Sequence, residues 1–245
     1  MLFKFVNTDA RALAAYEAAI SPVAGSAAVF EVGSLEEHIP GADVLVSAAN
    51  SRLFFDGGSD LAYLGAFPDL TDLSRRELRR HWDSGSLRSD ADVPHLPVGA
   101  AMLVPLPCGK QLLAAPTMIL PQTVTETENA YYAFKAMLHL LEKAVLPADA
   151  QVLVPGLCTG VGGMSAEVSA AQIVRAWREF HGGVRKDACT ERRDIAQDPT
   201  AMSHQPPEYM NSLFVKGHAA RATGAFTPPQ LLTPRCQGVD ARIWW

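Results

Sequence analysis

The sequence predicts a layered α/β/α fold built on a mostly parallel or mixed sheet. Segments with strand character alternate with segments of helical periodicity as far as residue 180, an order that places helices on both faces of a sheet. Two connections between a strand and the next helix, 49–59 and 156–163, are rich in glycine. Ligands bind such sheets beyond the carboxyl ends of the strands, so the sequence also predicts where a ligand would sit.

Short apolar or alternating segments bounded by turn residues predict the strands. The segment 43–48 reads DVLVSA, and its consecutive apolar residues indicate burial on both faces of the sheet. In chain order, the expected strands are 2–6, 27–32, 43–48, 99–105, 111–116 and 151–155.

Apolar residues at helical spacing predict the helices between these strands. Thr8 or Asp9 can cap the first helix with a side-chain oxygen. Ser21-Pro22 is expected to end that helix, because proline has no backbone N–H group. In chain order, the expected helices are 9–20, 60–67, 71–82, 126–144 and 165–180.

Capping residues mark further helix starts. Ser34 and Glu37 have the spacing of a capping box, which predicts a helical turn after the second strand. Thr125 and Glu128 have the same spacing and are expected to open the helix with the clearest apolar stripe. Ser165 is expected to cap the last helix.

The character of the sequence changes near residue 183. The segment that follows is charged and then rich in proline, with little periodicity, and it ends in the apolar residues Ile243-Trp244-Trp245. The predicted organisation is an α/β domain over 1–182 and a C-terminal extension over 183–245. The extension is expected to be an arm packed on the domain, or partly disordered.

Composition excludes several classes of protein. Hydrophobic residues make up 48% of the 245 residues and charged residues 19%, which suits a globular domain with a core. The net charge of -5 argues against general nucleic-acid binding. No apolar run is long enough for a membrane span. The four scattered cysteines and the histidines form no disulfide framework or metal pattern, so no metal is expected and a reducing cytoplasm is the expected compartment.

The second glycine connection, VPGLCTGVGGMSAE over 154–167, has the features of an anion-binding loop. Missing side chains let backbone N–H groups converge on an anion, and the helix expected to begin at Ser165 adds its positive end. A diphosphate would suit such a loop, although a plain glycine turn is the alternative. The pattern is neither a Walker loop nor a G-x-G-x-x-G dinucleotide turn. Its glycines are Gly156, Gly160, Gly162 and Gly163.

The first glycine connection combines an amide, two glycines and an acid. Asn50 follows the strand 43–48, and its amide can both donate to and accept from sugar hydroxyls. Gly57 and Gly58 allow close backbone approach, and Asp60 stands at the start of the next helix. The structural alternative makes Asn50 a turn residue and Asp60 a helix cap.

Together, ADVLVSAANSRLFFDGGSDLAY and VLVPGLCTGVGGMSAEVSAAQIVRAW resemble the two signature loops of macrodomains, in the right order. The resemblance covers residues 27 to 180 and is strongest to a bacterial macrodomain-like subgroup. It implies a three-layer α/β/α fold with a mixed central sheet and a cleft for ADP-ribose between the two loops. Some macrodomains remove ADP-ribose from proteins or nucleic acids, and others only bind it.

The resemblance also implies roles for individual residues. Asn50 matches the asparagine that contacts the distal ribose, and Asp60 matches the aspartate that hydrolytic members use, so both are candidate catalytic residues. No cofactor or metal is implied. The implied ligand-binding residues are Ser34, Ala48, Ala49, Asn50, Gly57, Gly58, Thr159, Gly160, Val161, Gly162 and Gly163.

The sequence departs from the family at a few of these positions. Ser47 replaces the usual asparagine, and Gly162 replaces an aromatic residue of the second loop. Ser34 stands where the family has the acid that contacts adenine, and Asp9 or Glu36 are the candidates to replace that acid.

These features leave more than one function open. The chain could bind ADP-ribose or an ADP-ribosylated macromolecule and hydrolyse the bond at the anomeric carbon of the distal ribose, with Asp60 orienting water. It could instead be a non-catalytic ADP-ribose reader. An unrelated nucleotide-dependent α/β enzyme is a third alternative, but no dinucleotide fingerprint supports it. Cys158 is expected to be a buried wall residue and not a nucleophile.

Overall fold

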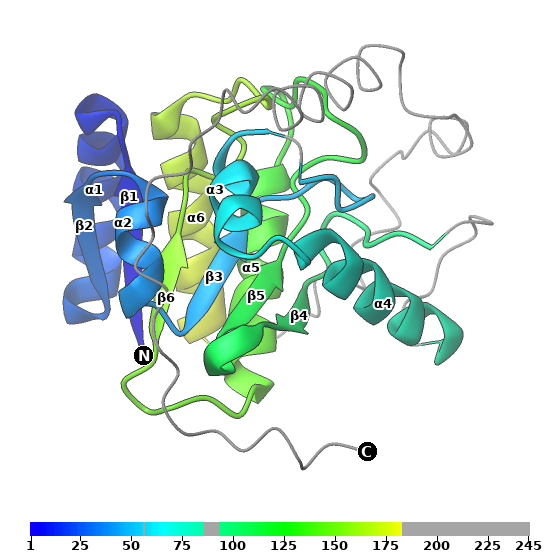
Figure 1. Cartoon of the computed structure of the whole chain (residues 1–245). Helices are drawn as coiled ribbons and strands as arrows, with labels where there is room; N and C mark the ends of the chain where they lie inside the picture. Colours follow the sequence, from blue (N-terminus) through cyan, green and yellow to red (C-terminus); the bar gives the residue numbers. More distant parts are fainter. Residues whose placement is uncertain (56, 86–93, 183–245) are drawn as a thin grey trace, which may run out of the picture. The chain divides into compact units, whose positions relative to one another are not determined.

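The computed structural model describes residues 1–55, 57–85 and 94–182 (Figure 1). The strands are β1 (Leu2–Asn7), β2 (Ala28–Val32), β3 (Val44–Ser47), β4 (Met102–Pro105), β5 (Gln111–Ala114) and β6 (Gln151–Val154). The helices are α1 (Ala10–Ala24), α2 (Leu35–His38), α3 (Ser59–Ala66), α4 (Leu70–Asp83), α5 (Asn129–Lys143) and α6 (Ala166–His181). Short 3-10 turns are η1 (Gly25–Ala27), η2 (Ile39–Gly41) and η3 (Pro107–Gly109).

The strands form one mixed sheet in the order β2-β1-β6-β3-β5-β4. All neighbouring strands run parallel except β4, which pairs antiparallel with β5. At the centre, Leu45 of β3 pairs with Leu153 of β6 and with Leu112 of β5. The carboxyl ends of β1, β6, β3 and β5 therefore lie along one edge of the sheet.

Alternation along the strands divides the core into two layers. Val44 and Val46 of β3 pack in one cluster with α1, α5 and α6, whereas Leu45 packs in the other with α2, α3 and α4. Figure 1 shows α3 and α4 on the near side of the sheet and α5 and α6 on its far side. The predicted three-layer α/β/α fold with a mixed sheet, which the macrodomain resemblance also implies, is confirmed.

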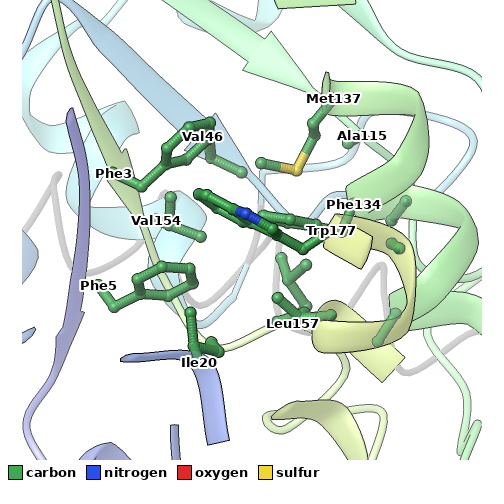
Figure 2. Packing of buried hydrophobic residues seen from close by; sticks show 14 of the residues in the cluster. Phe3, Phe5, Ile20, Val46, Ala115, Phe134, Met137, Val154, Leu157 and Trp177 are labelled. Atoms are coloured by element: carbon green, nitrogen blue, oxygen red, sulfur yellow. The ribbon is translucent and has the colours of Figure 1, made fainter. Parts of the chain in front are cut away.

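Aromatic side chains form the centre of the layer that contains α6. Trp177 meets the ring of Phe3 edge-on at 5.2 Å between centroids and stacks on Phe134 at 5.9 Å (Figure 2). Such rings bury large apolar areas and prefer these tilted or offset contacts. These contacts hold α6, the helix that follows β6, against β1 and α5.

Most predicted element boundaries agree with the structure within a few residues, but two details were wrong. Helix α1 continues through Pro22 and ends at Gly25, whose φ is 55°. A proline in the last turn removes a single helical hydrogen bond, and the left-handed glycine is the true stop. The Thr125 and Glu128 capping box does not form, because α5 begins only at Asn129, whose N–H group donates to Thr127 Oγ1.

Other local predictions are confirmed. The capping box of Ser34 and Glu37 is present at the start of α2, and Asp9 caps α1 by accepting the Arg11 N–H group. Ser165 caps α6 by accepting the N–H group of Val168.

The extension predicted over 183–245 lies outside the described residues. The predicted domain boundary at residue 182 therefore stays a prediction. Within the described ranges, no helix is long and apolar enough to cross a membrane. Cys158 is a free, buried thiol, as predicted. The cytoplasmic compartment stays a prediction.

Candidate functional site

The two glycine loops leave neighbouring parallel strands at the same edge of the sheet. The first loop, residues 48–58 with residue 56 outside the description, follows β3, and the second loop, residues 155–165, follows β6. Because β3 and β6 are paired in parallel, both loops begin side by side. Thr117, which follows β5, is attached to the first loop: its hydroxyl donates to the Ala48 carbonyl at 3.1 Å, and its N–H group donates to the Ala49 carbonyl at 2.9 Å.

At two positions of the second loop, neighbouring atoms lie so close to the backbone that a side chain would collide with them. A Cβ atom at Gly156 would lie 2.3 Å from Thr159 Oγ1, and one at Gly162 would lie 2.4 Å from the carbonyl oxygen of Cys158. The turn itself is closed by the Gly163 N–H group, which donates to the Gly160 carbonyl at 3.0 Å. The loop is therefore folded tightly on its own backbone, and a side chain at either required glycine would disrupt it.

The outer part of the second loop presents unused backbone donors. Among the described residues, the N–H groups of Thr159, Gly160, Val161 and Gly162 donate to no protein atom. Gly160 and Val161 are also exposed. Consecutive free N–H groups just before the N-terminus of a long helix form a site for an anion. Anion binding by this loop stays a prediction.

A buried hydrogen-bond network fixes the backbone of Leu157 near the start of the second loop. The Tyr16 hydroxyl lies 2.6 Å from Ser169 Oγ and accepts the Leu157 N–H group at 3.2 Å. Ser169 in turn donates to the Leu157 carbonyl at 2.7 Å. Burial raises the pKa of Tyr16 to about 12, so the phenol stays neutral at physiological pH. Helices α1 and α6 thus fix the position of the loop.

The connection between β5 and α5 supports the second loop from the side. The Val124 N–H group donates to the Gly162 carbonyl at 2.8 Å, and Val124 is buried. Gln172 of α6 donates through Nε2 to the Thr127 carbonyl at 2.7 Å and accepts the Tyr131 N–H group at 3.1 Å. This support had no clear signal in the sequence, because it depends on contacts distant along the chain.

Asn50 is engaged by its own loop. Its Oδ1 atom accepts the N–H groups of Arg52 and Phe54 at 3.0 and 3.3 Å, and its Nδ2 atom donates to the Phe54 carbonyl at 3.2 Å. The side chain is only 5% exposed. The structure thus gives Asn50 the turn-forming role that was the structural alternative, and contact with a sugar stays a prediction.

Asp60 lies in the first turn of α3 and is only 6% exposed. Its Oδ1 atom accepts the Ser47 hydroxyl at 2.7 Å, so the serine that departs from the family is the partner of the candidate acid. Tyr63 donates to the Val46 carbonyl at 3.0 Å, and burial followed by the charge of Asp60 raises the pKa of Tyr63 well above its usual value. A catalytic role for Asp60 stays a prediction.

Gly57 and Gly58 line the open side of the first loop. A Cβ atom at either position would meet no atom within 4 Å, and Gly58 has a φ of 57°. Gly58 therefore serves the left-handed turn into α3, and both glycines leave space beside the loop. Of the two implied alanines, Ala49 is buried and Ala48 half-buried, so contact of either with a ligand would come from the backbone.

Contact of Ser34 with adenine stays a prediction. Ser34 caps α2 at the end of β2, the outermost strand, and β1 separates β2 from β6. The carboxyl end of β1, at Asn7 and Asp9, is instead the neighbour of the second loop. Asn7 Nδ2 lies 3.5 Å from the position that a Cβ atom of Gly156 would take.

A small hollow opens at this end of β1. Its walls include Leu13 and Tyr16 of α1 and Pro155 and Gly156 of the second loop, with Asn7 as the polar residue. The sequence offered Asp9 as a substitute acid but could not place it, because the order of strands was unknown. Among the described residues, no cluster of histidine, cysteine or acidic side chains could hold a metal ion.

Comparison with known proteins gives one close relative and several distant structures. No family model matches the chain. An uncharacterized protein of Aquifex aeolicus is 32% identical over 143 residues, which cover 57% of this chain and 74% of that protein. A macrodomain of Oceanobacillus iheyensis solved with MES bound is 19% identical, with a TM-score of 0.42, over 57% of this chain and 69% of that one. A mutant of it solved with ADPR is 21% identical, with a TM-score of 0.41, over 55% and 68%. Because these TM-scores are low, we base the functional assignment on the loops of this chain.

The two kinds of glycine in the second loop predict different responses to substitution. Gly162→Ala places a methyl group against the Cys158 carbonyl, so we expect the free energy of unfolding to fall by about 1–3 kcal/mol. Gly160→Ala is the matched control, because its Cβ atom would meet no described atom within 4 Å. It should change the free energy of unfolding by less than about 0.5 kcal/mol. Urea denaturation of both variants measures this, and equal stabilities would contradict the close packing of the loop.

Proposed function

We propose that the chain, which belongs to the same protein family as the uncharacterized protein of Aquifex aeolicus, binds ADP-ribose or an ADP-ribose adduct. The observation that carries the proposal is the run of N–H groups from Thr159 to Gly162 that donate to no atom of the described residues. The resemblance of both loops to macrodomain signatures supports a diphosphate between two sugars as the anion.

The second loop would hold the diphosphate without a positively charged side chain. Backbone N–H groups and the positive end of α6 stabilise negative charge by their dipoles. This fits a protein whose net charge is -5, since a ligand bound by dipoles needs no basic surface. Binding by backbone dipoles also suits a small dianion better than an extended polyanion.

The end of β1 would lie beside the base of the nucleotide. The Nδ2 group of Asn7 is a donor there, next to Gly156 of the second loop. The exposed carboxylate of Asp9 is close to Asn7 along the chain and could accept a hydrogen bond from an amino group of the base. This assignment replaces Ser34 with the end of β1 as the base-recognition element.

The first loop would receive the distal ribose, and its geometry favours binding without turnover. The amide of Asn50 is already used within its loop, and the carboxylate of Asp60 is buried against Ser47. A general base must reach the attacking water. We therefore favour an ADP-ribose reader, whose partner is an ADP-ribosylated macromolecule.

Hydrolysis at the distal ribose is the second candidate function. Asp60 lies one residue beyond Gly57-Gly58-Ser59, and the open sides of the two glycines would leave room for a sugar. A small movement of α3 would be needed to present the carboxylate to a water molecule at the anomeric carbon.

A charged side chain in the open part of the second loop tests the binding proposal. Gly160→Glu should weaken ADP-ribose binding by at least about tenfold, because a carboxylate would occupy the place of the phosphates, while the melting temperature stays unchanged. Gly41→Glu adds the same charge at another open glycine and should leave the affinity unchanged. Isothermal titration calorimetry measures both, and equal affinities for the two variants would contradict the proposed site.

Incubation with an ADP-ribosylated protein separates the reader from the hydrolase. We expect the wild-type chain to bind the modified protein and to release no ADP-ribose, since Asp60 is turned toward Ser47. Chromatography of the released nucleotide measures this. Release by the wild-type chain that Asp60→Ala abolishes, with binding retained, would establish the hydrolase instead.

A further inference from the structure

Helix α4 carries a group of exposed arginines in its two middle turns, which we call the arginine face. Its members are Arg75, Arg76, Arg79 and Arg80. The spacing i, i+1, i+4 and i+5 places them in two adjacent rows, with one helical turn between the two arginines of each row. Glu77 is the one acid between them. The middle of α4 is therefore a compact cationic surface on a chain whose net charge is negative.

The opposite side of α4 fixes the orientation of the arginine face. Leu70 and Leu78 are buried in the same apolar cluster as Met102 and Val104 of β4. These contacts set the rotation of the helix about its axis, so the arginine face points away from the sheet. A lipid surface does not suit this helix, because a basic amphipathic helix enters a bilayer with its apolar side, and here that side is buried in the core.

Most of the arginine face has no partner within the described part of the chain. The Nε group of Arg80 donates to Glu77 Oε1 at 3.1 Å. The side chains of Arg75, Arg76 and Arg79 make no hydrogen bond or ion pair with any described residue. The face is therefore available to a partner without the loss of an existing ion pair at three of its four positions.

The charges around the arginine face favour binding of an anion. Like charges at positions i and i+4 repel each other, and the face contains two such pairs, Arg75 with Arg79 and Arg76 with Arg80. An anion between the two rows would relieve this repulsion. The flanking acids Asp72 and Asp83 limit the face to the middle of α4, so it can meet a few phosphates and not a long polyanion.

We propose that the arginine face binds the phosphate backbone of a nucleic acid, at a site separate from the glycine loops. A guanidinium group is a planar fork that matches phosphate oxygens, and all four cations of the face are arginines. Among the described residues of α4, no large apolar side chain is exposed. The core of a protein–protein interface uses such apolar anchors, whereas contacts to phosphates need none.

This inference goes beyond the proposed function and does not depend on it. The net charge of -5 argues against nucleic-acid binding over the whole surface, but it does not determine where positive charges gather. Contacts to phosphates also carry no base readout, so the face would bind without regard to sequence.

The salt dependence of binding to a fluorescein-labelled oligodeoxythymidine tests the proposal. In fluorescence anisotropy, the logarithm of the association constant of the full chain should fall with the logarithm of salt concentration, with a slope of about -2 to -3. Arg75→Gln/Arg79→Gln removes two phosphate contacts. It should weaken binding on the order of tenfold and reduce the slope by about 1.4, since each contact to a single strand contributes about 0.7.

Lys143→Gln/Arg178→Gln is the matched control, because it removes the same charge from exposed positions in the last turns of α5 and α6. It should change the affinity for the oligonucleotide by less than about twofold, since charges distant from the bound strand are screened by salt. Both double variants should keep the wild-type affinity for ADP-ribose in calorimetry, because neither changes the glycine loops.

Each of the remaining outcomes decides against one proposal. Equal losses of oligonucleotide affinity in the two double variants, or a wild-type chain that does not bind the oligonucleotide, would overturn this inference. Polyglutamate that competes as well as unlabelled oligonucleotide would identify an acidic protein as the partner and would overturn it too. Failure to bind ADP-ribose would contradict the proposed function and leave this inference standing.

Discussion

The parallel pairing of β3 with β6 is the constraint on which the site depends. Leu45 faces Leu153 across this pair, and both side chains are fully buried. Because parallel strands end at the same edge of a sheet, the pairing brings two loops 100 residues apart in sequence to adjacent positions. Buried helices on both faces make the register difficult to change, since a slip of one residue would turn apolar side chains toward the wrong layer.

The two loops use their polar groups in opposite ways. The second loop leaves backbone donors open, and its shape is maintained from outside by Tyr16, Ser169 and Val124. The first loop consumes its side-chain polar groups internally, through Asn50 and Asp60. A rigid, pre-formed donor set suits tight binding of a diphosphate, because little order must be gained when the ligand arrives. The inward polar groups of the first loop are the reason that we propose binding and not catalysis.

Much of this arrangement followed from local sequence patterns. The consecutive apolar residues of 43–48, the capping box at Ser34 and the glycines after β6 depend on nearby residues, and each was predicted correctly. The order of strands was not predictable in this way, because pairing joins distant segments. The turn formed by Asn50 was open for a similar reason, because an amide that can bind a sugar can equally close its own turn.

The assignment of the second loop to a diphosphate can be tested most directly by the backbone amides themselves. Two-dimensional NMR of labelled protein, recorded as ADP-ribose is added, reports on each N–H group separately. The largest shifts should fall on Thr159, Gly160, Val161 and Gly162, with smaller ones at Asn7 and in the first loop. Saturable shifts confined to other parts of the domain, with these four amides unmoved, would contradict the proposed site.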